Sequence, residues 1–177
     1  MRLRNQHCVP RIGPLFLLEM KLNFVLLAIL CWLTPWLATA GGPPARIFKV
    51  LPHFLDTNGL HTLSPSLYER DAYQAHLREH PEKRSGIRFD VQWKNRAPVF
   101  GKLILRVELR GILEGKLPRS RVLEQEVEPS GFWGRWTSFK LSGTDYRDFG
   151  EVTAWRATLL EDNQLIAEQK SFLWSTE

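Results

Sequence analysis

Alternation of apolar and polar residues is the clearest pattern in the chain and predicts β-structure. Residues 87–94 alternate strictly, with Ile87 and Trp93 at the limits of the apolar set, and residues 103–110 repeat the pattern. A period of two places one set of side chains in the core and the other in water. We therefore predict two half-buried strands. If these two strands pair, Asp90 and Glu108 would face arginines across the ladder.

The remaining strand candidates are shorter or less regular. Pro52 restricts the first of them to an edge or a bent strand. Residues 161–164 are a polar turn signal, so the last two strands should form a C-terminal hairpin. Its register stays open because residues 152–160 carry apolar side chains on both faces. The candidates cover residues 47–55, 121–127, 136–141, 152–160 and 165–174.

A single segment, residues 64–80, has the signals of a helix. Ser64 before Pro65 fits an N-cap followed by a first-turn proline, and Ser66 with Glu69 fits a capping box. Pro81 ends the helix. We expect its apolar stripe to lie on the sheet. The stripe consists of Leu67, Tyr68, Ala72, Tyr73, Ala75 and Leu77.

About seven strands with one short helix inserted after the first predict a mostly β fold, a single antiparallel β-sandwich over residues 47–177. Residues 41–46, with two glycines and two prolines, should be a tether. Residues Leu141–Tyr146, followed by a Trp-bearing strand and a hairpin, resemble the E-to-F corner of immunoglobulin-like and fibronectin type III domains. The resemblance implies an immunoglobulin-like sandwich in which Tyr146 ties down the turn. Residues 49–71 also resemble part of small exported bacterial proteins with no assigned activity.

The segment from Met20 to Ala40 has the three parts of a secretory signal peptide. Lys21 supplies a positive start, residues 24–33 are apolar, and Ala38 and Ala40 place small side chains before the cleavage point. We therefore predict an exported protein located in the periplasm, the cell envelope or the medium. Residues 1–19 are expected to be untranslated or a disordered extension. The alternative is an uncleaved anchor, because residues 22–38 just reach the length of about 17 residues needed to span a bilayer.

The positions of the cysteines and the balance of charge argue against thiol chemistry and nucleic-acid binding. Cys8 and Cys31 both precede the predicted cleavage point, so disulfides and thiol chemistry are not expected in the exported domain. The chain has 24 Lys and Arg against 19 Asp and Glu, but four of the basic residues and one acid precede Gly41. The remaining 20 and 18 leave a net charge of +2, with both signs interleaved. This balance predicts no nucleic-acid partner.

No catalytic motif or cofactor loop occurs, so we expect neither enzyme activity nor a cofactor. His76 and His80 share a helix face and are weak metal candidates, with His53 or His61 as a third ligand. The favoured interpretation is that His76 and His80 form a solvated helix end, where His80 caps the last carbonyls. Three alternating acids, Glu124, Glu126 and Glu128, indicate a solvated face or a protected edge rather than a catalytic pair.

The aromatic sequence from Phe132 to Trp136 is the main candidate surface. Aromatic side chains on a glycine-flanked loop can stack on sugars or anchor a protein. Trp136 is expected to begin a strand and fill one end of the core, whereas Phe132 and Trp133 either cover the core or project for binding.

The sequence thus predicts a non-enzymatic structural or protein-interaction module. One alternative is a carbohydrate-binding module that uses Phe132, Trp133 and Trp136, and another is a His-bound metal protein. The expected partner is a protein or a cell-envelope glycan, with membrane attachment only through an uncleaved leader.

The leader assignment predicts that the exported protein begins at Gly41. Edman sequencing and intact mass of the processed protein should show this N-terminus. A protein recovered from the membrane fraction with residues 22–38 intact would contradict cleavage.

Overall fold

The computed structural model describes residues 42–174. The predictions for residues 1–19 and for the leader at 20–40 lie outside the described residues. Within the predicted tether, Gly42 to Pro44 have no regular structure, and the first strand begins at Ala45, two residues before the expected domain boundary. Among the described residues, the strands and the buried core lie within 45–174.

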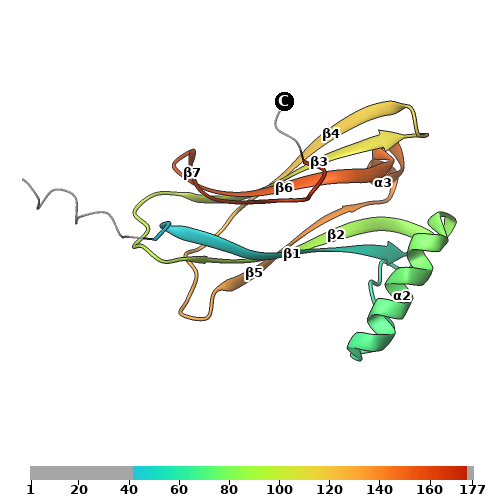
Figure 1. Cartoon of the computed structure of the whole chain (residues 1–177), viewed down its shortest axis with the longest axis horizontal. Coiled ribbons are helices and arrows are strands. Elements are labelled where there is room, and N and C mark those ends of the chain that lie inside the picture. The colour runs from blue at the N-terminus through green and yellow to red at the C-terminus, as the bar shows by residue number, and fades with distance from the viewer. Residues whose placement is uncertain (1–41, 175–177) are drawn as a thin grey trace, which may run out of the picture. The chain divides into compact units, whose positions relative to one another are not determined.

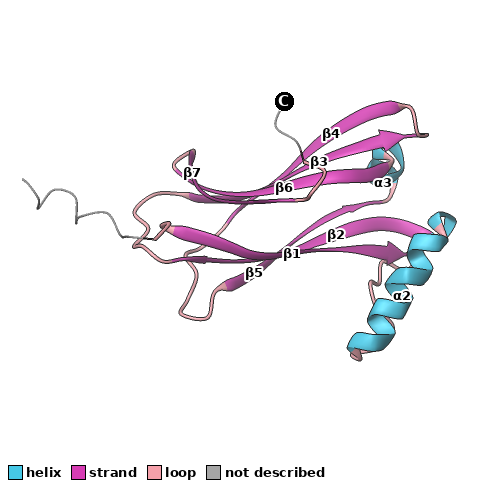
Figure 2. Ribbon diagram, in the orientation of Figure 1, coloured by secondary structure: helices cyan, strands magenta, loops and turns pink. Residues whose placement is uncertain are grey.

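The described domain is a mostly β fold with seven strands, as the sequence predicted (Figures 1 and 2). Two α-helices interrupt the strand succession, one after the first strand and one after the fifth. The elements are β1 (Ala45–Asp56), α2 (Leu67–Glu79), η2 (Pro81–Lys83), β2 (Arg84–Asn95), β3 (Leu103–Leu113), β4 (Leu117–Glu126), β5 (Arg135–Ser142), α3 (Thr144–Phe149), β6 (Glu151–Glu161) and β7 (Gln164–Lys170).

The strands form two antiparallel sheets that pack face to face (Figure 1). One sheet has the order β1-β2-β5 and the other β4-β3-β6-β7. The conditional pairing of residues 87–94 with 103–110 is wrong, because the chain crosses from one sheet to the other between β2 and β3. Asp90 instead lies opposite Leu51 and Ser138, and Glu108 lies opposite Val122 and Arg156.

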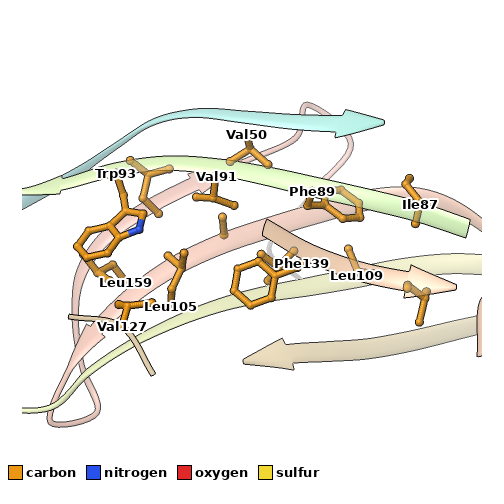
Figure 3. Close-up of a cluster of buried hydrophobic side chains, with 14 of the residues drawn as sticks. Val50, Ile87, Phe89, Val91, Trp93, Leu105, Leu109, Val127, Phe139 and Leu159 are labelled. Atoms are coloured by element: carbon orange, nitrogen blue, oxygen red, sulfur yellow. The ribbon is translucent and has the colours of Figure 1, made fainter. Parts of the chain in front are cut away.

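The core fills the space between the two sheets and uses the alternating positions that the sequence indicated (Figure 3). Phe89, Val91 and Trp93 of β2 are fully buried against Leu105 and Leu159 of the opposite sheet. Burial of one large apolar side chain is worth about 1.5–3 kcal/mol, so this layer dominates the stability of the fold. The indole N–H of Trp93 donates a 3.0 Å hydrogen bond to Thr137 Oγ1, which satisfies its single donor inside the core.

The C-terminal hairpin forms as predicted, and its register can now be stated. Asp162 and Asn163 both have positive φ, 47° and 67°, as the two central residues of a type I′ turn require. Ala157 and Leu159 of β6 point into the core. The last strand ends at Lys170, four residues before the predicted end.

Helix α2 forms where expected, but it differs from the prediction in its start and in its buried face. It begins at Leu67, and the flanking Ser66 makes no side-chain capping bond. Most of the predicted stripe is not packed on the sheet: Leu67 and Tyr68 are exposed, and among the helical residues only Gln74 and Leu77 are buried. The helix lies at the end of β1, beyond the sheet surface that the full stripe would need (Figure 1). No helix within residues 42–174 is long and apolar enough to cross a bilayer.

Gln74 explains how α2 is attached to the sandwich. Its amide accepts from the N–H of Phe54 at 2.8 Å and donates to the carbonyl of Phe54 at 2.9 Å. The backbone N–H and C=O of Phe54 both point away from β2. The side-chain amide of Gln74 therefore bonds to β1 as a neighbouring strand would. This contact closes part of the free edge of β1.

The segment that resembles an E-to-F corner contains a short helix, α3, that the sequence did not predict. Tyr146 lies within it and packs, half-buried, against the core. Burial raises the pKa of Tyr146, and the guanidinium of Arg84 opposes that rise. Gly150 ends the helix at φ 83°, where a Cβ would lie 2.5 Å from the carbonyl oxygen of Ile112, so glycine is required there.

Replacing Thr137 by valine keeps the side-chain volume but removes the acceptor for the Trp93 indole. We expect Thr137→Val to lower the free energy of unfolding by about 1–3 kcal/mol, because the buried N–H then has no partner. In a Trp93→Phe background the same change should cost much less. Urea unfolding of the four proteins measures this coupling, and an equal cost in both backgrounds would contradict it.

Candidate functional site

The outer face of the β1-β2-β5 sheet gathers the polar and aromatic side chains that are candidates for function. Because the odd-numbered residues 87–93 of β2 face the core, Arg88, Asp90, Gln92 and Lys94 must face outward. The register sets them in rows with residues of β1 and β5. Toward α2 the loop of residues 57–66 covers this face, and we call that part the covered half. The part toward the start of β1 is the open half, which carries Arg46, Lys49, Lys94 and Trp136.

Asp90 is the centre of the covered half. It accepts hydrogen bonds from Arg88 Nε at 2.8 Å and from Ser138 Oγ, and His53 Nε2 lies 3.8 Å from its carboxylate. Burial alone would raise the pKa of Asp90, but the bonds from Arg88 and Ser138 and the charge of Arg88 outweigh burial, so the pKa is lowered. The carboxylate therefore stays ionised and links β2 to β5.

His53 lies beside this carboxylate yet is held neutral. It is only 9% exposed, since the ring of His61 lies over it with 5.4 Å between ring centroids. Burial lowers the pKa of His53, and the attraction of Asp90 only partly offsets burial because His61, Arg70 and Arg88 oppose a further positive charge. The short distance to Asp90 thus does not make a charged pair at neutral pH.

Asp56 positions His61 by ordering the loop after β1. Its Oδ1 accepts from the N–H groups of Asn58 and Leu60, both at 2.8 Å, and its Oδ2 accepts from the Tyr73 hydroxyl of α2 at 2.8 Å. The turn after β1 is therefore fixed to the helix. The loop folds back over the sheet and brings His61 onto His53.

The geometry of the covered half does not suit nucleophilic catalysis. A nucleophilic serine needs to donate its hydroxyl proton to a general base, most often histidine. Ser138 donates instead to Asp90, whose lowered pKa makes it a poor base. Ser138, Asp90 and His53 are thus better explained as a polar clasp that holds the loop to the sheet.

Trp136 lies in the open half, so the expectation that it fills one end of the core is wrong. Trp136 is 50% exposed and lies opposite Gln92 on the outer face. The cause is the phase of β5, in which Thr137, Phe139 and Leu141 point inward and force the alternate residues outward.

The loop of residues 130–134, which we call the aromatic loop, carries the other two candidates. Phe132 is 78% exposed and Trp133 is 89% exposed, so neither covers the core. Their rings meet edge to face, at 87° and 5.2 Å between centroids. The loop is fixed to β2 because Ser130 and Asn95 exchange hydrogen bonds, and Lys94 Nζ lies 4.7 Å from the centroid of the Phe132 ring. The aromatic side chains thus project from a held backbone.

His76 and His80 lie at the C-terminal end of α2, where they take part in ending the helix. His80 Nδ1 lies 2.9 Å from the carbonyl oxygen of His76, the capping contact that the sequence favoured. The Nε2 atom of His76 is occupied by the ammonium of Lys83 at 3.0 Å, a poor environment for a second cation. The part of the chain that the structure describes holds no group of three potential metal ligands.

No protein-family model matches the chain, no curated protein is significantly similar in sequence, and no solved structure is significantly similar in fold.

Sequence reasoning missed the clasp around Asp90 and the role of the loop after β1. The alternation placed Asp90 on a wet face beside Arg88, but Ser138 and His53 come from β5 and β1, whose pairing to β2 no local pattern specifies. A signal for Trp136 was present. The positions alternating with it in β5 are the more apolar set.

The neutral state of His53 predicts a loss of stability in mild acid. Because the folded pKa lies below the ordinary value of 6.5, the unfolded chain binds a proton first, and stability falls as the pH drops through about 6.5 toward the folded pKa. His53→Gln should make this fall shallower. Chemical unfolding at several pH values between about 7.5 and about 5.5 tests this, with an unchanged slope as the contradicting result.

Proposed function

We propose that the exported chain is a non-enzymatic interaction module with an immunoglobulin-like sandwich of the fibronectin type III kind. The strand order supports this topology: β1, β2 and β5 correspond to A, B and E, and β4, β3, β6 and β7 to C′, C, F and G. Such sandwiches carry binding surfaces on their loops and faces, while the fold itself dictates no activity. Export rests on the leader sequence from Met20 to Ala40.

The aromatic loop is the proposed contact surface, and the exposure of Phe132 and Trp133 is the observation that carries the proposal. Two large aromatic rings in water are unfavourable, and burying each against a partner would gain about 1.5–3 kcal/mol. Their backbone is already fixed through Ser130 and Asn95, so binding would order few additional groups. These are the properties of an anchor residue in an interface.

The two alternatives receive less support. A glycan platform generally needs coplanar rings, whereas Phe132 and Trp133 are perpendicular and only Trp136 lies on the sheet surface. A His-bound metal would have to displace Lys83 from His76. We therefore favour an apolar or amphipathic target over a polysaccharide or a metal ion.

The proposal predicts that the aromatic loop mediates attachment to the cell envelope. The processed protein should co-sediment with a total envelope fraction of the producing cell, and Trp133→Ala should weaken sedimentation by roughly tenfold or more, as expected for an anchor residue. Phe172→Ala is the control, because Phe172 is also highly exposed but follows β7 of the four-stranded sheet, next to the middle of β6. Equal sedimentation of wild type and Trp133→Ala would refute the proposed surface.

A further inference from the structure

The two sheets differ sharply in charge, although the chain as a whole is nearly balanced. Strands β1, β2 and β5 together contain seven Lys and Arg but only two acids, Asp56 and Asp90. Strands β3, β4, β6 and β7 contain six of each. On the second sheet the charges pair across strands, as in Arg106 with Glu124 and Arg156 with Glu108. The folding topology therefore concentrates unbalanced positive charge in the three-stranded sheet.

Within the outer face of that sheet, the strand positions of the open half carry no carboxylate, and the acids nearest to Trp136 are Glu126 and Glu128, which line the same hollow. Arg46 and Lys94 lie opposite each other, and Lys49 lies in the row of Gln92 and Trp136. The only acid between the ends of this face is Asp90, which the covered half already neutralises. Among the residues that the structure describes, Arg46, Lys49 and Lys94 make no ion pair.

The exposed aromatic tips lie at the same end of the sandwich as these cations. The register places the start of β1 beside the end of β2 and the start of β5, and therefore beside the aromatic loop. The connection between β2 and β3 also lies at this end (Figure 1), and it carries Phe100, which is 94% exposed. The first described residues, Gly42 to Pro44, also lie at this end, directly before β1.

We propose that the open half and the aromatic loop bind an anionic lipid surface, with Phe132 and Trp133 inserted among the headgroups and Arg46, Lys49 and Lys94 against lipid phosphates. This inference rests on the proposed function and names the partner of its contact surface. Amphipathic aromatic rings favour the membrane–water interface, and each nearby Lys or Arg adds attraction to anionic lipid. The perpendicular rings at a projecting tip suit insertion between headgroups better than flat stacking on a sugar chain.

Vesicle sedimentation of the processed protein, Gly41–Glu177, tests the inference without interference from the leader. Binding is expected to vesicles of phosphatidylglycerol mixed with phosphatidylcholine, to weaken as salt screens the charges, and to be much weaker with phosphatidylcholine alone. Trp133→Ala should reduce partitioning by roughly tenfold. Arg46→Gln with Lys49→Gln should reduce it by about fivefold per residue.

Matched controls separate a specific surface from general charge. Lys116→Gln with Arg119→Gln removes the same charge at the opposite end of the domain and should leave partitioning nearly unchanged. Circular dichroism of each variant checks that it is folded. Equal losses from both charge pairs, or equal binding to neutral and anionic vesicles, would overturn the lipid proposal.

Comparison with envelope sedimentation distinguishes failure of the two proposals. If vesicles do not bind while envelope binding still depends on Trp133, the contact surface stands and its partner is a protein or a glycan, so the lipid inference is wrong. If neither preparation binds in a Trp133-dependent way, both proposals fail.

Discussion

Burial of one face of β2 is the constraint on which the rest of the molecule depends. Phe89, Val91 and Trp93 have no exposed surface, and they meet Leu105 and Leu159 across the sandwich. A shift of one residue in the register would expose this whole set and bury Arg88, Asp90, Gln92 and Lys94. The core therefore fixes which side chains face outward. Because β2 is the central strand of its sheet, its register also sets which residues of β1 and β5 lie beside each outward-facing residue of β2.

The two halves of the resulting outer face differ in how their charged side chains are paired. In the covered half, Asp90 accepts hydrogen bonds from Arg88 and from Ser138 of β5, and the ring of His61 lies over His53 of β1. Losing one partner of such a network leaves a buried charge uncompensated, which makes this half structural. In the open half the cations have no such carboxylate, and Trp136 is held outward by the phase of β5. The stabilising polar contacts of this face thus lie near α2, and the side chains proposed to bind a partner lie near the aromatic loop.

How much of this the sequence could predict depended on whether the determining interaction was local. The strict alternation in residues 87–94 predicted the core strand, and the turn at Asp162 and Asn163 predicted the hairpin. The apolar stripe of α2 was misleading because only Gln74 and Leu77 of this helix are buried. The segregation of charge between the sheets was invisible along the chain, since strands of the two sheets interleave in sequence. The bond from Ser138 to Asp90 was also invisible along the chain, because these two residues are distant in sequence.

The most direct test of the account is a map of where the protein meets lipid. Amide resonances of the isotope-labelled processed protein would be followed by NMR on adding phosphatidylglycerol bicelles. The account predicts changes concentrated at residues 46–49, at residues 92–95 and in the aromatic loop, with α2 and the outer face of the four-stranded sheet unaffected. Changes centred on α2 or on β3 and β4, with residues 130–136 silent, would contradict it.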